Sequence, residues 1–147
     1  MMYFVNREKI EDTLTFLEEQ IKIFKQLDHI ENQVQSAALE RVAQMMLESV
    51  IDVGNSLIDG FIMRDPGSYE DIIDILMDEQ VISKKDGEQL KRLIPFRKRL
   101  VLFFTSIDHE KLYQLVNKNL QAFIDFPTHV RKYLAKELGP VSAFKSE

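Results

Sequence analysis

Cysteine is absent from the 147 residues of the chain. Its absence excludes disulfide bonds, cysteine-ligated zinc and a cysteine nucleophile, and it fits the reducing cytoplasm in which we expect the protein. Long apolar runs are missing too: the longest, Leu100–Phe104, falls far short of the roughly 20 residues that cross a bilayer. The first ten residues, MMYFVNREKI, lack the basic and apolar regions of a signal peptide. We therefore expect neither secretion nor a membrane span.

Motifs that hold metals or cofactors are also missing. The three histidines, His29, His109 and His129, form neither H-E-x-x-H nor the E-x-x-H of a di-iron bundle, and the chain has no glycine-rich phosphate loop. We expect no metal and no cofactor. The net charge of −5 argues against binding nucleic acid through bulk charge, so any contact with RNA requires a local basic patch.

Apolar residues recur at helical spacing along the first half of the chain. After Asn6, a good N-cap, they predict a helix over residues 7–27 that buries one face: Ile10, Leu14, Leu17, Ile21 and Phe24. A second helix is predicted over 36–59, and its wide apolar arc is typical of a helix in the middle of a bundle. Strand signals are nearly absent, which predicts an all-α fold.

Serine and proline mark the next elements. Ser68 predicts a capped short helix over 68–79, in which Tyr69 is interpreted as a packing residue. Ser83 predicts a helix over 83–105 that Pro95 kinks or restarts.

The last part of the chain is expected to form one more long helix and a further helical stretch after it. Asp108 predicts a cap for a helix through about Phe126, after which Pro127 bends the chain into a last helical stretch ending at Gly139. The prediction is an up-and-down helical bundle of four main helices plus short ones. Residues 1–140 form a single domain in this prediction, and residues 141–147 form a tail.

An arginine stands in the middle of an apolar helical face. On a helical wheel, Arg97 lies at the centre of a face formed by Leu90, Leu93, Ile94, Leu100, Val101 and Phe104. Because an isolated buried charge is very costly, Arg97 must be paired, reach an interface or line a cavity. Two interpretations stay open: a structural arginine paired with a carboxylate, and an arginine that contacts a ligand or RNA.

Two charged surfaces accompany this arginine. The opposite face of its helix carries Lys91, Arg92, Lys98 and Arg99, and residues 84–99 hold seven basic and two acidic residues, a local charge of +5. This basic face is either solvated or a patch for RNA or an acidic partner. Helix 36–59 carries an acidic stripe, which is either exposed or supplies the partner of Arg97; the candidate partners are Glu48, Asp52 and Asn55.

The stretch PGSYEDIIDILMDEQVISKKDGEQLKRLIPFRKRLVLFF resembles the HepT-like family of the HEPN superfamily, as do ALERVAQMMLESVIDVGNSLIDG and VNREKIEDTLTFLEEQ. Members of this family carry R-N-R-L-V-H-x-Y, whose arginine and histidine form a ribonuclease site. Here the run from Arg97 to Phe104 reads R-K-R-L-V-L-F-F. The resemblance implies a HEPN-like helical fold and a role of toxin–antitoxin type.

The chain departs from this motif at two of its three functional positions. Arg97 is retained, but Leu102 stands where the family has histidine, and Phe104 where it has the tyrosine that a nucleotidyltransferase antitoxin modifies with AMP. Neither leucine nor phenylalanine can transfer a proton or accept a nucleotidyl group. The ribonuclease site is therefore predicted to be degenerate.

The spacing within the motif predicts a homodimer. Residues 97 and 102 lie about 140° apart around a helix and about 7.5 Å along it, so one helix presents the pair poorly to a single phosphate. Two copies related by a twofold axis can bring the positions together, and the apolar end at 102–104 suits such an interface. The resemblance likewise implies a site built across a homodimer.

The leading hypothesis is a binding protein for RNA or for a nucleotidyltransferase-type partner. One alternative is an active, metal-independent endoribonuclease that uses Arg97, with Arg99 or His109 replacing the missing histidine. A second alternative is a non-catalytic helical scaffold or regulatory dimer.

Overall fold

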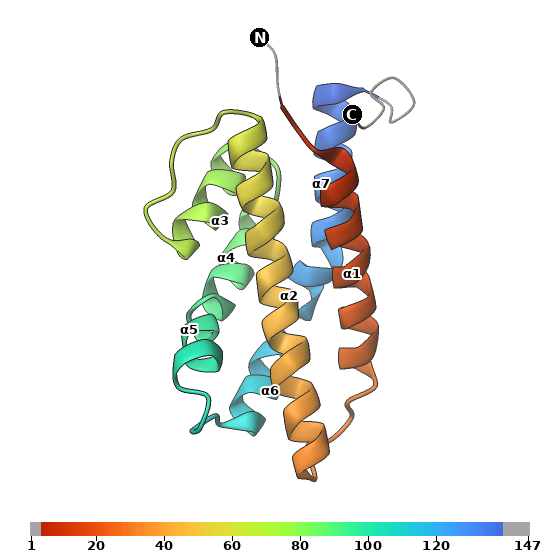
Figure 1. Cartoon of the computed structure of the whole chain (residues 1–147), viewed down its shortest axis with the longest axis vertical. Helices are drawn as coiled ribbons and strands as arrows, with labels where there is room; N and C mark the ends of the chain where they lie inside the picture. The colour runs from red at the N-terminus through yellow and green to blue at the C-terminus, as the bar shows by residue number, and fades with distance from the viewer. Residues whose placement is uncertain (1–3, 140–147) are drawn as a thin grey trace.

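The computed structural model describes residues 4–139, and all regular secondary structure in that range is helical (Figure 1). The three longest helices are α1 (Arg7–Lys25), α2 (Gln33–Gly60) and α7 (Leu120–Leu138). Four shorter helices complete the described part: α3 (Tyr69–Asp78), α4 (Lys84–Leu93), α5 (Pro95–Leu102) and α6 (His109–Lys118). The predicted all-α bundle is confirmed. The predicted tail, 141–147, lies outside the described residues.

Helix α1 forms for the reasons that its sequence indicates. The Asn6 side chain accepts a hydrogen bond from the Lys9 backbone N–H at 3.0 Å and so caps the helix. The predicted apolar face is buried throughout: Ile10, Leu14, Leu17, Ile21 and Phe24. The helix packs along α2 and α7, which places its exposed side on the edge of the bundle.

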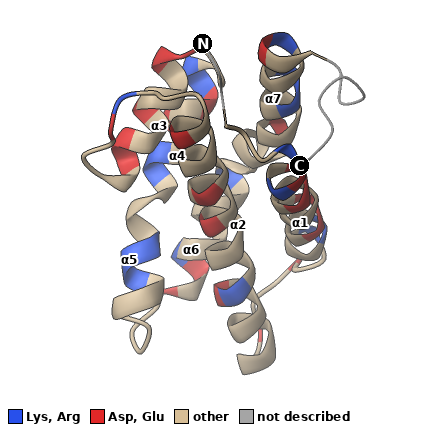
Figure 2. Cartoon of the chain, turned by 45° about the horizontal axis from the view of Figure 1, so that its top comes forward, with Lys and Arg blue, Asp and Glu red and all other residues tan. Residues whose placement is uncertain are grey.

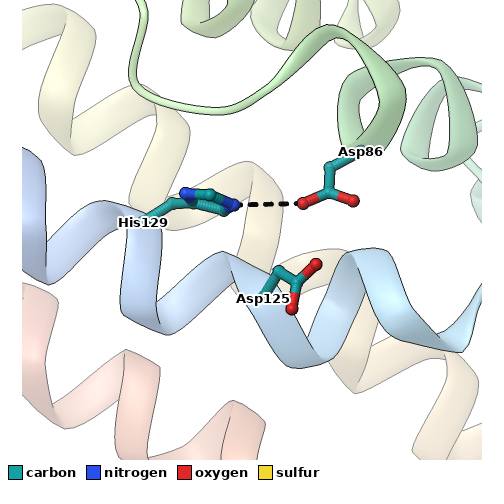
Figure 3. A group of neighbouring side chains, drawn as sticks. All are labelled: Asp86, Asp125 and His129. Atoms are coloured by element: carbon teal, nitrogen blue, oxygen red, sulfur yellow. Dashed lines mark hydrogen bonds and ion pairs between the residues drawn. The ribbon is translucent and has the colours of Figure 1, made fainter.

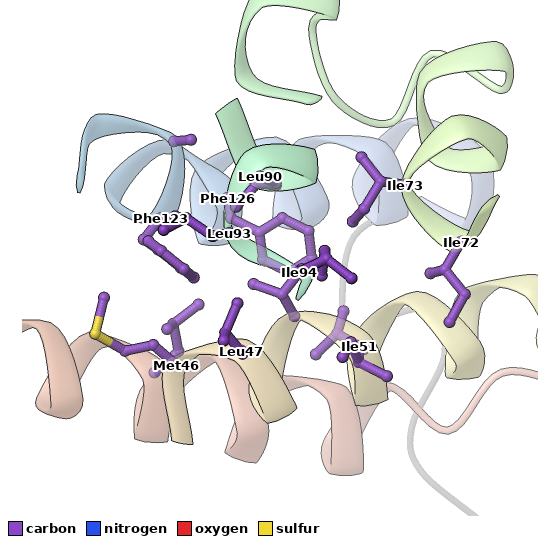
Figure 4. Packing of buried hydrophobic residues seen from close by; sticks show 14 of the residues in the cluster. Met46, Leu47, Ile51, Ile72, Ile73, Leu90, Leu93, Ile94, Phe123 and Phe126 are labelled. Carbon is purple, nitrogen blue, oxygen red and sulfur yellow. The ribbon is translucent and has the colours of Figure 1, made fainter. Parts of the chain in front are cut away.

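Helix α2 runs through the middle of the bundle and contacts five of the other helices (α1, α3, α5, α6 and α7). It begins three residues before the predicted start, because Asn32 caps it and accepts a hydrogen bond from the Gln35 N–H at 2.9 Å. Figure 4 shows Met46 and Leu47 within the apolar layer that α4 and α7 complete. No helix in the described part of the chain is long and apolar enough to span a membrane.

Two serines and a proline organise the middle of the chain as predicted. Ser68 and Ser83 accept hydrogen bonds from backbone N–H groups three residues on, at 3.0 and 3.1 Å. Helix α4 ends at Leu93, and α5 restarts with Pro95 in its first position, where the missing N–H costs no helical hydrogen bond.

The prediction that the helix restarted at Pro95 continues to residue 105 is wrong. Helix α5 ends at Leu102, because Phe103 adopts φ −115° and ψ 39° and leaves the helical region. Phe104 therefore does not continue the Arg97 face, and its side chain is exposed. The wheel assumed an ideal helix across 95–105, and the chain leaves that geometry three residues early.

The predicted division of the C-terminal helices is also wrong. The break falls at Asn119, which is buried, and its side-chain N–H donates to the Leu115 carbonyl at 2.9 Å. Its amide thus satisfies a carbonyl at the end of α6, after which α7 begins. Pro127 lies inside α7 and is itself buried, with Phe126 and Val130 buried beside it. Packing of this apolar face outweighs the hydrogen bond that the proline removes.

Candidate functional site

Arg97 projects from the first turn of α5 towards α2. Its Nε donates a hydrogen bond to Oε1 of Glu48, and its guanidinium carbon lies 4.5 Å from the centre of the Tyr69 ring. The side chain is 25% exposed, so the charge is partly removed from water and is balanced from two sides. The arginine is consequently held in one orientation before any ligand arrives.

Glu48 is the member of the acidic stripe that meets Arg97. It lies on the half-buried side of α2, whereas Asp52 and Asn55, one and two turns further along, are exposed. Both interpretations of the stripe therefore apply to different residues: one carboxylate pairs with the arginine, and the others face solvent.

A groove of about 430 Å³ opens beside this pair, and it brings Arg97 and Leu102 together on one surface. Its walls come from the start of α3 and from the α4–α5 junction: Tyr69, Glu70, Ile94, Pro95, Arg97, Lys98, Val101 and Leu102. Phe104 is not part of the groove. The aliphatic side chain of Leu102 offers neither a proton donor nor an acceptor there.

The far end of α5 presents an apolar surface. Leu102, Phe103 and Phe104 are 61%, 54% and 61% exposed, in a chain whose other aliphatic and aromatic residues are mostly buried. Three consecutive apolar residues at this exposure form a local patch, which we call the 102–104 patch. Patches of this kind mark surfaces that other molecules cover.

The predicted basic face is divided between two environments. Lys91 on α4 forms an ion pair with Asp74 of α3 at 2.8 Å, and this hydrogen bond raises the pKa of Lys91. Arg92, Lys98 and Arg99 are exposed and form no ion pair within residues 4–139. Figure 2 shows Lys and Arg residues in blue along α4 and α5, and Asp and Glu residues in red on α2.

Two groove residues escaped the sequence analysis. Tyr69 was interpreted as a packing residue, but its side chain is 43% exposed and stacks on Arg97. Glu70, the next residue, lines the same groove. The sequence signal that bears on both residues is the Ser68 cap, which fixes where α3 begins and hence where the two side chains lie. In the groove, Tyr69 supplies a hydroxyl with an exchangeable proton, and Glu70 supplies a carboxylate with acceptor oxygens.

The histidine proposed as a replacement lies elsewhere. His109, at the start of α6, binds the Glu40 carboxylate of α2 through Nε2 at 2.6 Å and does not line the Arg97 groove. Arg99 does not line it either, and its guanidinium lies 5.9 Å from the Phe96 ring. Within one chain, neither residue takes the place of the motif histidine.

Comparison with known proteins matches this chain to one protein family and one fold. The model of the family "Ribonuclease HepT-like" matches residues 7–130. "Putative RNase YutE" of Bacillus subtilis (strain 168) is 49% identical over 144 residues, which are 98% of this chain and 100% of that one. The solved structure of YutE, described as a cytosolic protein of unknown function, covers 97% of this chain and 100% of its own with a TM-score of 0.90.

More distant structures share the fold at low identity. A tri-AMPylated HEPN toxin of Shewanella oneidensis in complex with MNT antitoxin gives a TM-score of 0.74 at 17% identity, covering 84% of this chain and 96% of that one. A toxin–antitoxin structure with AMP-PNP gives 0.75 at the same identity, covering 84% and 97%. The fold, the family model and the long match to YutE together show that this chain belongs to the ribonuclease HepT-like family.

Proposed function

We propose that this HepT-like protein binds a phosphate-bearing partner at the Arg97 groove and does not cleave RNA at a rate useful to a toxin. The observation that carries the proposal is that Leu102 lines the groove with Arg97. The resemblance of the 97–104 run to the family motif assigns this leucine to the position of the family's histidine. A positioned general acid or base contributes about 10²–10⁴-fold to a rate. Arginine stays protonated in proteins, so Arg97 cannot remove a proton from a 2′-hydroxyl.

RNA is the first phosphate-bearing ligand to test. Arg97 and Lys98 line the groove, and the exposed Arg92 and Arg99 lie on the same two helices. Cations spread along one surface attract a nucleic-acid backbone, and such binding weakens steeply as salt rises. Glu48 already occupies one edge of the Arg97 guanidinium, so a phosphate would bind through the remaining N–H groups.

A nucleotidyltransferase-type antitoxin is the proposed protein partner. This is supported by the HEPN toxin that was solved in complex with MNT antitoxin and shares this fold. Phe104 has no hydroxyl, so it cannot accept AMP at the position of the family's tyrosine. We therefore expect an antitoxin-type partner to bind without modifying this position.

The proposed assembly is a homodimer in the cytoplasm, with residues 1–140 as one domain. The 102–104 patch supports the dimer, because burying three exposed apolar side chains removes their surface from water. Light scattering at micromolar concentration should give about twice the chain mass of 17.2 kDa. A clean monomer would contradict the dimer and any site built across it.

The central experiment compares three proteins on a structured RNA: wild type, Leu102→His, and Leu102→His with Arg97→Ala. We expect no robust cleavage by wild type. Cleavage by Leu102→His that Arg97→Ala abolishes would show that the fold retains the family's geometry. Metal-independent cleavage by wild type that is lost in Arg97→Ala would overturn the proposal.

RNA retention is tested separately from cleavage. Arg97→Ala should weaken the binding of a labelled RNA and lower the dependence of binding on salt by about one phosphate contact. Lys22→Ala, which removes an exposed cation from α1, is the matched control and should leave both unchanged. If wild type retains no RNA at any salt concentration, the scaffold or regulatory dimer is favoured over an RNA-binding protein. Equal salt-dependent retention by wild type and Arg97→Ala would place RNA binding outside the groove.

An active endoribonuclease is the second candidate. Tyr69 and Glu70 line the Arg97 groove and supply groups that can transfer protons, and the relative YutE is named for RNase activity. Glu70→Gln and Tyr69→Phe would then abolish a wild-type cleavage activity. Growth arrest on overexpression, relieved by either variant, would favour this candidate over the binding protein.

A further inference from the structure

A second cluster of polar side chains lies between α4 and α7, away from the α5 groove. Asp86 comes from α4, and Asp125 and His129 come from α7 (Figure 3). Each offers one ligand atom, and these atoms all lie within 4.8 Å of one another. His129 Nε2 is 3.2 Å from Asp86 Oδ2.

Local structure fixes each member of the cluster. Asp86 follows the Ser83 cap in the first turn of α4, and its side chain is only 7% exposed. Asp125 and His129 are four residues apart, so they share one face of α7. Gln121 donates a hydrogen bond to Oδ1 of Asp125 at 2.8 Å and orients that carboxylate. The three groups therefore converge without rearrangement of the backbone.

The charges of the cluster are unbalanced in the protein alone. Two carboxylates face one imidazole, and the Asp86 side chain is only 7% exposed. A buried carboxylate is costly unless it is paired or coordinates a metal. A dication bound between the two carboxylates would neutralise both.

A cavity lies on the His129 side of the cluster, and Asp86 and Asp125 do not line it. His129 lines a cavity of about 500 Å³ between the α3–α4 connection and α7. Lys84, Lys132 and Lys136 also line this cavity. Because a dication would cancel the charge of the two carboxylates, the completed site would have no net charge and would not repel these lysines. Water could fill coordination positions on the cavity side, as in metal sites with three protein ligands.

We propose that Asp86, Asp125 and His129 bind one divalent transition-metal ion. One imidazole nitrogen and two carboxylate oxygens suit Zn²⁺, Mn²⁺ or Fe²⁺ better than Ca²⁺ or Mg²⁺, which prefer oxygen ligands alone. Facing helices of a bundle commonly build such sites, with ligands one turn apart on one helix. The site is independent of the Arg97 groove and stands whether or not the protein binds RNA.

The first test titrates Zn²⁺, as the only metal ion present, into untagged full-length protein and measures binding by isothermal titration calorimetry. Wild type should bind one Zn²⁺ per chain, and its Tm should rise by about 5–10 °C at a hundredfold excess of Zn²⁺ over Kd. Co²⁺ should give visible d–d absorption with one equivalent. Mg²⁺ at the same concentrations should produce neither effect.

Three substitutions locate the site. Asp86→Asn, Asp125→Asn and His129→Gln should each weaken Zn²⁺ binding by at least about 100-fold, since losing even an outer partner of a ligand costs 10–100-fold. His109→Gln is the matched control, because it removes the other histidine paired with a carboxylate. Circular dichroism before titration confirms that each variant is folded.

Two results would overturn the proposal. One is the absence of saturable Zn²⁺, Mn²⁺ or Fe²⁺ binding to folded wild type. The other is binding that the three variants retain, or that His109→Gln loses equally, which would place the ion elsewhere on the protein.

Discussion

Helices α4 and α5 are adjacent and both are basic, yet the fold treats them differently. On α4, Lys91 is paired with Asp74, and Leu90 and Leu93 are buried. On α5, only Leu100 is buried, Lys98 and Arg99 have no ion pair among the described residues, and the C-terminal end is apolar and exposed. Helix α4 therefore contributes more buried residues to the fold than α5, whose Lys98, Arg99 and apolar end stay exposed.

The largest expected effect tests the structural half of this comparison. Leu93 is 1% exposed, and Leu93→Ala should lower the free energy of unfolding by about 2–5 kcal/mol through lost burial and a cavity. Urea unfolding followed by circular dichroism measures it. A loss below about 0.5 kcal/mol would show that α4 is not part of the core, and the comparison would fail.

Arg97 lies at the boundary between the two roles. Arg97→Ala should cost about 1–3 kcal/mol, because it leaves the half-buried Glu48 carboxylate without its charged partner. Arg97→Met keeps the length of the side chain and should cost a similar amount for the same reason. If both variants unfold like wild type, the arginine contributes nothing to the fold and serves a ligand alone.

A cation paired on the opposite side of the bundle provides a reference for Arg97. Arg131 of α7 binds Glu11 and Glu18 of α1, and its hydrogen bonds lower the pKa of both carboxyl groups below their usual 4.5. A lowered pKa in the folded state adds stability above pH 4.5, which is lost as pH falls through the folded values. The groups are largely exposed, so the contribution should not exceed about 1 kcal/mol.

The measurement compares the free energy of unfolding of wild type and Arg131→Gln between pH 7 and pH 3. The difference between them should shrink as the pH drops below 4.5. A difference that stays constant across this range would mean that the three charges do not interact in solution.

The smallest expected effect on stability tests the other half of the comparison. Leu102→Ser and Phe104→Ser replace exposed side chains, so each should change the free energy of unfolding of the monomer by no more than about 0.5 kcal/mol. The double variant should nevertheless be monomeric by light scattering at a concentration where wild type is a dimer. A dimer that survives both substitutions would place the interface outside the 102–104 patch.

Much of the fold could be predicted from local signals. Asn6, Ser68 and Ser83 act within three residues of themselves, and the periodic apolar face of α1 is buried in full. The break at Asn119 could not be predicted, because its amide acts only in the context of a buried helix end. The helix break predicted at Pro127 is wrong for a related reason, because tertiary packing of α7 outweighs the tendency of proline to interrupt a helix.

The candidate site was predictable only in part. The wheel placed Arg97 on an apolar face and named Glu48 among three partners, but choosing between them required the angle at which α5 crosses α2. Tyr69 reaches the groove from a different helix, which no spacing rule reveals. Likewise, Asp86 lies 39 residues before Asp125, so only the fold shows that they meet.

The exposure of residues 102 and 104 has a consequence for how the family can change. Leu102 is the last residue of α5 and Phe104 lies two residues beyond it, and each is 61% exposed. Substitution at such positions costs little stability, so selection on folding does not preserve what stands there. By the family resemblance these are the positions of the histidine and the tyrosine, so a single substitution at either position should leave the bundle folded.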